Sequence, residues 1–178
     1  MPRPASDKRE RLTAAAIELA RSAGFEAATI ARIAQEAQVP SGSVYYYFKT
    51  KEDVAAAVGA GIAARLAAVR AEHPDGPREA LSAFLRSYLG DAAATVSYGT
   101  LLSTASAVGG ADAHREALAW IQERFEGLGF PAAAARARAL HLLAGVEGGG
   151  ALAHALGDAE PLEREVAHLE RWVANAGT

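Results

Sequence analysis

Apolar residues recur along most of the chain at spacings of three and four, the period of an amphipathic α-helix. The strict alternation that marks a half-buried strand is absent. Glycines and prolines divide the pattern, and helices are expected over 6–23, 29–37, 41–48, 51–70, 78–96, 98–107, 112–128, 132–156 and 161–174, the first with Ser6 as its N-cap. The pattern predicts an all-α fold of about nine helices.

Residues 29–51 predict two short helices joined by a tight turn. In the first helix Ile30 and Ile33 share the inward face, and Thr29 stands in the N-cap position. Pro40 and Gly42 disfavour continuation of this helix and allow a sharp change of direction. A helix-turn-helix that binds DNA is built in this way.

The second helix of this pair is expected to pack Val44 and Phe48 inward. Tyr45–Tyr47 cannot all face inward on one helix, so at least one of these tyrosines is expected to be exposed beside Lys49 and Lys51, which are expected phosphate partners. The outer side lacks Arg, Asn and Gln, so direct base readout is expected to be thin. The expected DNA-binding residues are Thr29, Arg32, Ser41, Gly42, Ser43, Tyr45, Tyr46, Tyr47, Lys49 and Lys51.

Residues 12–51 resemble the DNA-binding head of the tetracycline-repressor (TetR) family of bacterial transcriptional regulators. The resemblance implies a three-helix head with the helix-turn-helix at about 29–48, within a DNA-binding domain at 6–66, and a helical ligand-binding and dimerisation body at 67–178. It also implies a dimeric repressor that a small apolar or aromatic effector releases from a palindromic operator. The matching residues are Ala15, Ala16, Leu19, Gly24, Phe25, Thr29, Ile33, Ala34, Val39, Gly42, Val44, Tyr45, Phe48, Lys49 and Lys51.

The charge is distributed as this resemblance implies. Residues 1–51 hold eight Lys or Arg against five Asp or Glu, a formal charge of +3, whereas residues 52–178 hold ten against sixteen, a charge of −6. Only the head is basic, as expected if that end meets phosphate. The first residues, with Arg3, are either a solubilising terminus or an arm that enters a minor groove.

Other features of the chain narrow its class. It has no cysteine, which excludes disulfides and thiol-based sensing. Its five histidines share no metal-ligand spacing, and no nucleophile elbow or phosphate loop is present, so no enzyme activity, cofactor or metal is expected. The longest apolar region, 139–156, is interrupted by polar residues, and no secretory signal is visible, so a cytoplasmic protein without a membrane partner is expected. A helical adaptor that kept the helix-turn-helix shape without binding DNA stays as the alternative.

The last two expected helices are interpreted as the dimer interface. They carry an apolar seam beside a tryptophan, together with glycines that permit close backbone approach. The alternative is that the seam closes the core of one chain. The expected interface residues are Gly145, Gly148, Gly149, Leu162, Val166, Leu169, Trp172 and Val173.

An effector pocket is expected in the body, following the family pattern. Its candidate lining is mostly apolar and aromatic, with a histidine or a tyrosine hydroxyl to fix one polar group of the ligand. The candidate residues are Tyr88, Tyr98, Leu102, Trp120, Phe125 and His141.

Overall fold

The computed structural model describes residues 5–71 and 76–177. Within these ranges the chain is helical and contains no strand, which confirms the expected all-α fold. The expected arm at Arg3 lies outside the described residues. The helices are α1 (Ala5–Ala23), the 3₁₀ helix η1 (Phe25–Ala27), α2 (Ile30–Glu36), α3 (Ser41–Tyr47), α4 (Lys51–Ala71), α5 (Pro77–Gly90), α6 (Ala92–Tyr98), α7 (Leu101–Ala107), α8 (Ala111–Gly127), α9 (Ala132–Leu156) and α10 (Glu160–Ala174).

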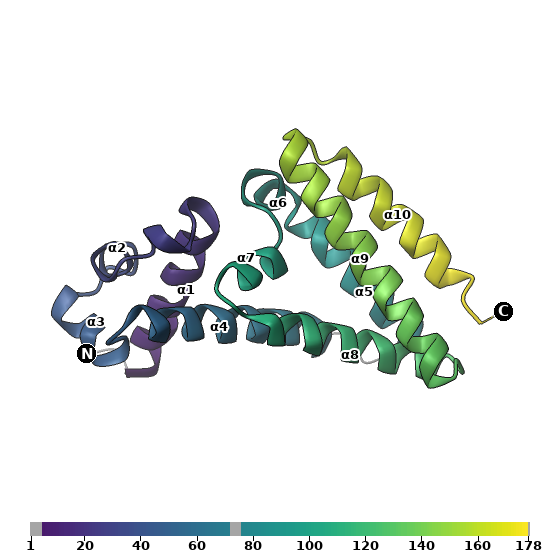
Figure 1. Ribbon diagram of the computed structural model, residues 1–178, viewed down its shortest axis with the longest axis horizontal. Coiled ribbons are helices and arrows are strands. Elements are labelled where there is room, and N and C mark those ends of the chain that lie inside the picture. Colours follow the sequence, from purple (N-terminus) through teal and green to yellow (C-terminus); the bar gives the residue numbers. More distant parts are fainter. Residues whose placement is uncertain (1–4, 72–75, 178) are drawn as a thin grey trace.

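The molecule is elongated, with α1, α2 and α3 at one end and α9 and α10 at the other (Figure 1). The long helix α4 runs from the head into the body, where it packs against α8, α5 and α7. In the body, α9 packs against both α8 and α10, and α10 also packs against α5. Helix α4 is therefore the principal mechanical link between the two ends.

The apolar core extends through the head, where it is built by the inward faces that the pattern predicted. Leu12 of α1, Ile33 of α2, Val44 of α3 and Phe48 just after α3 are all essentially inaccessible to solvent. Helix α1 also lies close against α4 at Gly61, where an added Cβ would come within 2.7 Å of the Ile17 side chain. A side chain at this position would push α1 away from α4.

Several expected boundaries are wrong, each for a local reason. The first helix already contains Ala5 and Ser6, whereas Ser6 was expected to precede it. The helix expected over 78–96 is two helices, because the chain turns at Gly90 and Asp91. The helix expected to start at Tyr98 starts at Leu101 instead, because Gly99 adopts φ 84° and Thr100 forms the N-cap.

By length and hydropathy, α4 is the described helix that could cross a membrane, with a mean hydropathy of 1.5 over its best window. The sequence analysis had placed the longest apolar region in 139–156. The composition of α4 reflects its many alanines, and its large apolar residues Val54, Val58, Ile62 and Leu66 are buried against other helices. A single such helix that packs inside a folded chain is weak evidence for a membrane span.

Candidate nucleic-acid interface and ligand cavity

Local contacts fix both ends of α2, the first helix of the helix-turn-helix. Thr29 caps α2 by accepting a hydrogen bond from the backbone N–H of Arg32, as the sequence predicted. At the other end Gln38 adopts φ 53°, a left-handed conformation that is uncommon for residues other than glycine. The guanidinium of Arg11 in α1 donates to the carbonyls of Ala37 and Gln38. The reversal therefore occurs at Gln38, and Gly42, which was expected to permit it, lies inside α3.

The outer face of α3 is small, hydroxyl-bearing and aromatic. Tyr45 is 59% exposed and Tyr46 is 81% exposed, and Tyr46 is the most exposed of the large apolar or aromatic side chains in the described residues. Ser41 and Gly42 are also exposed, and nothing lies within 4 Å of a Cβ built at Gly42. Tyr47 is half-buried, and its ring meets that of Tyr46 edge-on at 5.2 Å. Backbone and hydroxyl groups on this face are free to approach a phosphate backbone or a groove.

The two lysines that were expected to bind phosphate have different surroundings in the structure. The Lys49 side chain is exposed. The Lys51 ammonium donates instead to the carbonyls of Phe25 (2.6 Å), Glu26 (3.3 Å) and Ala28 (3.3 Å) and lies 4.3 Å from the centre of the Phe25 ring. Because its three donors already have acceptors, the phosphate role expected for Lys51 is corrected to a structural one, closing the end of η1.

A lysine that the sequence analysis counted in the head but did not place at the interface lies beside α3. Lys8 of α1 lines one surface hollow with Ser43, Tyr46 and Tyr47. The sequence contained little indication that Lys8 lies beside α3, because the two are distant in the sequence and only the packing of α1 brings them together. Arg32 is exposed on α2, with one guanidinium nitrogen 3.4 Å from the Ala27 carbonyl oxygen.

Lys49→Ala is expected to change the salt dependence of DNA binding, whereas Lys51→Ala is expected to change the stability of the head. If the exposed Lys49 meets one phosphate in each head, its loss lowers the slope of log affinity against log salt by about 0.9 per head. Loss of Lys51 is expected to destabilise the head by about 1–2 kcal/mol with little change in the salt slope, since it leaves carbonyls without a donor. Binding titrations at several salt concentrations and urea unfolding of both variants check this. A lowered salt slope in the Lys51 variant alone would contradict it.

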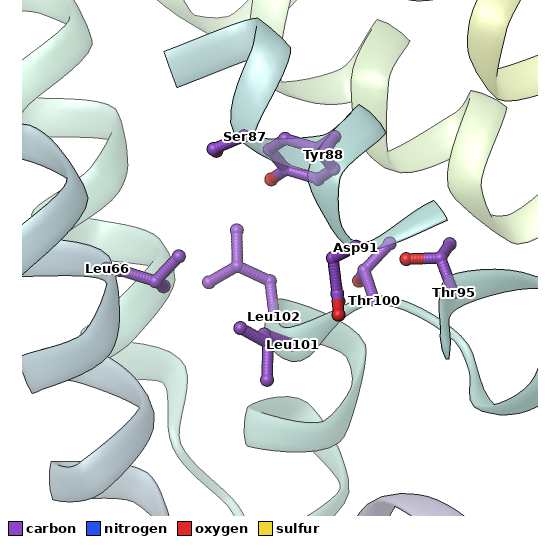
Figure 2. Close-up of a pocket in the computed structure, with 8 residues that line it drawn as sticks. All are labelled: Leu66, Ser87, Tyr88, Asp91, Thr95, Thr100, Leu101 and Leu102. Atoms are coloured by element: carbon purple, nitrogen blue, oxygen red, sulfur yellow. The ribbon is translucent and has the colours of Figure 1, made fainter. Parts of the chain in front are cut away.

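The body contains a small cavity where α4, α5, α6 and α7 meet. Its volume is about 40 Å³, enough for ordered water but well below the size of pockets that hold drug-sized molecules. Figure 2 shows Leu66 of α4 on one side, Leu101 and Leu102 of α7 in the middle, and hydroxyl and carboxylate groups on the other side. The lining residues are Leu66, Ser87, Tyr88, Asp91, Thr95, Thr100, Leu101 and Leu102.

Only Tyr88 and Leu102 of the expected pocket residues line this cavity. Tyr98 is 45% exposed at the end of α6. The other three form ring contacts in two groups. Trp120 packs on Phe84, which also packs on Tyr88, whereas Phe125 and His141 both pack on Trp172. Of these three residues, Phe125 is buried in the core, Trp120 is half-buried and His141 is exposed, and none of them lines the cavity.

Glu147 of α9 is a half-buried acid to which the sequence analysis gave no role. It accepts hydrogen bonds from the Tyr88 hydroxyl at 2.8 Å and from the Thr100 hydroxyl at 2.7 Å. Burial raises the pKa of Glu147 above its ordinary value, while the bonds from Thr100 and Tyr88 and the charge of His114 act in the opposite direction. Burial and the neighbouring carboxylate also raise the pKa of Tyr88. In sequence, this residue showed only as an interruption of an apolar helix.

Arg21 of α1 joins the head to the cavity wall. Its side chain is only 4% exposed and forms a two-pronged ion pair with Asp91, including a 3.1 Å bond between Nη1 and Oδ1. It also donates to the carbonyl of Gly99 at 2.8 Å and approaches the Thr95 hydroxyl at 3.5 Å. Asp91 and Thr95 line the cavity, so the same residues face the cavity and hold the head.

The expected dimer seam is buried inside one chain, so its assignment to the interface is corrected. Leu162, Val166, Leu169 and Val173 are all fully buried, and Trp172 is half-buried against Phe125. At Gly149 an added Cβ would come within 3.0 Å of the Glu165 side chain and 3.4 Å of the α10 backbone, and at Gly145 it would meet Glu165 as well. The seam and these two glycines close α10 onto α9 within the chain, which was the alternative interpretation. Of the expected set, Gly148 alone faces solvent.

A different face of α9 is apolar and uncovered. Leu140, Leu152 and Leu156 are 49%, 56% and 68% exposed, although they are large aliphatic residues. Ala144, Gly148 and Ala151 are also exposed and lie at helical spacing between them. Contiguous exposed apolar surface of this kind marks a contact surface in soluble proteins.

One comparison with known proteins matches the head of this chain, and another matches nearly its whole length. The family model described as bacterial regulatory proteins of the tetR family matches residues 12–58. No curated protein sequence matches the chain. Solved structures match almost its whole length: a TetR transcriptional regulator from Legionella pneumophila (21% identity, 97% of this chain and 99% of that chain, TM-score 0.79) and a transcriptional regulator from Rhodococcus sp. Rha1 (25%, 96% and 98%, 0.72). The reduced form of NemR from E. coli is also similar (24%, 93% and 96%, 0.72).

Proposed function

This chain belongs to the TetR family of DNA-binding transcriptional regulators, and on that premise we propose that it is a homodimeric, cytoplasmic repressor released from a palindromic operator by a small molecule. The observation that carries the proposal is the face of α3, with Tyr45 and Tyr46 exposed to solvent beside Ser41 and Gly42. The family is one of regulators and not of enzymes, in agreement with the absence of catalytic motifs in the sequence.

The operator is expected to be recognised largely through its backbone and shape. No side chain on α3 can form the bidentate bonds by which Arg reads guanine or Asn reads adenine. Hydroxyls of Ser41, Ser43 and the tyrosines reach phosphates or single base edges, and Lys8 and Lys49 supply charge next to them. Specificity then depends in part on the sequence-dependent deformability of the operator.

The proposed dimer forms through the uncovered face of α9. Two copies related by a two-fold axis bring the same apolar patch together, so Leu152 and Leu156 are buried on both sides. The symmetric pair presents two α3 helices, which requires an operator with two inverted half-sites. This is the reason for expecting a palindrome.

Release by an effector is proposed to act through the cavity. The cavity is small, so a ligand must widen it. Its walls include Leu66 of α4 on one side and Asp91 and Thr95 on the other, and these last two residues bind Arg21 of the head. Movement of either wall changes the spacing or tilt of the two heads. A ligand that binds the released state ~100-fold more tightly supplies about 2.7 kcal/mol per site.

The proposal is tested by incubating the purified full-length protein with fragmented genomic DNA and sequencing the fragments that it retains. A recurring palindrome is expected, and Tyr46→Ala, which changes an 81% exposed side chain, is expected to remove the enrichment without altering stability. Equal retention of all fragments by both proteins would contradict site-specific binding by α3. In that case the adaptor interpretation gains support.

A further inference from the structure

The turn of the helix-turn-helix contains the one residue in the described part of the chain, other than glycine, that has a positive φ. Gln38 adopts φ 53° directly after α2. Its backbone N–H donates to the Gln35 carbonyl at 3.1 Å, and the N–H of Val39 donates to the Ala34 carbonyl at 2.9 Å. These two bonds form the Schellman motif that ends many helices, in which glycine usually occupies the left-handed position. Because the Cβ of Gln38 disfavours this conformation, the local sequence alone does not explain it.

Arg11 of α1 binds the backbone on both sides of Gln38. Its Nη2 group donates to the carbonyl of Ala37 and, at 3.3 Å, to the carbonyl of Gln38. Both carbonyls lie at the C-terminal end of α2, where the helix dipole favours a cation. They belong to the two peptide groups that flank the Gln38 Cα, and φ and ψ of Gln38 determine how these groups are oriented relative to each other. A single donor that binds both carbonyls therefore favours one pair of φ and ψ values.

The direction of α3 depends on this turn. Helix α3 begins at Ser41, and Val39, which lies between Gln38 and α3, is buried in the core. A different φ or ψ at Gln38 would either swing α3 out of its place in the head or withdraw Val39 from the core. Helix α3 carries the exposed Tyr45 and Tyr46, so a change in its direction moves the face that is proposed to meet DNA.

We propose that Arg11 is a positioning residue for DNA binding, which holds Gln38 in the left-handed conformation and thereby sets the direction of α3. This inference rests on the proposed function, because it takes α3 as the helix that meets DNA. An arginine at this place has two alternative roles, a direct contact to phosphate and a contribution to stability alone. The test below separates the three roles.

The variants Arg11→Ala and Gln38→Gly, alone and together, form a double-mutant cycle in the full-length protein. Arg11→Ala is expected to increase the equilibrium constant for unfolding in urea by about fivefold or more, because it removes a charged donor from two carbonyls. Glycine adopts a positive φ without a steric penalty, so the double variant is expected to return to within about twofold of the wild type.

The second measurement is DNA affinity, for the palindromic fragment that the wild-type protein enriches. Fluorescence anisotropy follows binding at several salt concentrations without denaturant, where circular dichroism shows each variant to be folded. Arg11→Ala is expected to bind about tenfold more weakly with an unchanged salt slope, since no phosphate contact is lost. Adding Gln38→Gly is expected to restore the affinity to within about threefold of the wild type. A contribution to stability alone would not change the affinity of the folded protein.

Arg9→Ala is the matched control, because it removes the same charge from the same helix. Arg9 is exposed and lines a surface hollow with Gly61 and Arg65 of α4, away from the turn. Gln38→Gly is expected to change the affinity of the Arg9 variant by the same factor as that of the wild type. The restoring effect of Gln38→Gly is therefore specific to the loss of Arg11.

Three results would overturn the proposal. A loss of affinity that Gln38→Gly does not restore, with a salt slope lowered by about 0.9 per head, would make Arg11 a phosphate partner. A loss of stability with unchanged affinity would limit Arg11 to a structural role. Equal effects of Arg11→Ala with and without Gln38→Gly would show that Arg11 does not hold the turn. If Arg11→Ala alone does not fold, folding of the double variant supports the proposal, and failure of the double variant to fold overturns it.

The two measurements also separate this inference from the proposed function. If the wild-type protein enriches no palindrome, the proposed function fails, and the urea cycle still decides whether Arg11 holds Gln38. If a palindrome is enriched and the cycle shows no coupling between Arg11 and Gln38, the proposed function stands and the role of Arg11 is wrong.

Discussion

Leu152→Glu is expected to convert the proposed dimer to a monomer and to reduce operator affinity by a factor of about 10² or more. Leu152 lies in the centre of the uncovered apolar face of α9 and is 56% exposed in the single chain. A carboxylate there is well solvated in the monomer, so folding of the chain is little affected. In the symmetric dimer two such carboxylates would be buried in the same interface, at a cost of several kcal/mol.

Sedimentation velocity measures the oligomeric state, and a titration with a palindromic fragment measures the affinity. The matched control is Leu89→Glu in α5, a leucine that is 38% exposed and lies outside the α9 face. This control is expected to remain dimeric and to bind DNA. A Leu152 variant that stays dimeric would show that the two copies meet elsewhere, and the α9 interface would then be abandoned.

The loss of affinity has a simple origin. Two heads on one rigid dimer bind their half-sites with a high effective concentration, so the second contact adds greatly to the first. Separate monomers lose this advantage although every residue of α3 is intact. Binding of the monomer at high protein concentration, with the same preference for half-sites, is therefore the expected residual activity.

Arg21→Ala is expected to lower the free energy of unfolding by about 2–3 kcal/mol and to weaken the link between head and body. The Arg21 side chain is buried and bonds to Asp91 and to the Gly99 carbonyl. Its removal leaves the carboxylate and the carbonyl without a buried donor. Because Asp91 is itself 36% exposed, water can hydrogen-bond to its carboxylate in the variant. The loss in free energy of unfolding is therefore smaller than for a fully buried pair.

Urea unfolding followed by circular dichroism measures this change. Arg65→Ala is the control, since Arg65 joins α4 to Glu18 of α1 with side chains that are 39% and 56% exposed. Exposed pairs contribute at most about 1 kcal/mol, so the control is expected to lose little. A double-mutant cycle of Arg21→Ala with Asp91→Asn separates the ion pair from the bond to Gly99. Equal losses in the Arg21 and Arg65 variants would contradict the assigned role of Arg21.

The fold class and the position of the helix-turn-helix were predictable from the sequence because they depend on local periodicity. Thr29 caps α2 as its spacing predicted, and Val44 and Phe48 are buried on the inward face. The sharp change of direction after α2 was expected from Pro40 and Gly42. The residue with left-handed backbone is Gln38, and Arg11 of α1 donates to the carbonyls of Ala37 and Gln38, a contact across 26 and 27 residues of sequence.

The body was less predictable because its apolar residues have two possible destinations, the core of the chain or a surface that meets another molecule. The seam from Leu162 to Val173 has the periodicity of an interface helix but is buried against α9 and α5. The residues that remain exposed, Leu140, Leu152 and Leu156, lie on α9 and carry the same chemical signal in sequence. Periodicity identifies an apolar face without stating which neighbour covers it.

By itself the sequence determined the all-α class, the basic head and the helix pair α2 and α3, since helical period, capping and charge are properties of neighbouring residues. Only the tertiary structure decided which polar groups meet across the fold. It joined Lys51 to η1, Arg21 to Asp91 and Glu147 to two cavity hydroxyls. Each of these partnerships spans tens of residues, and each is set by how the helices pack, because a buried charge takes the partner that packing places within reach.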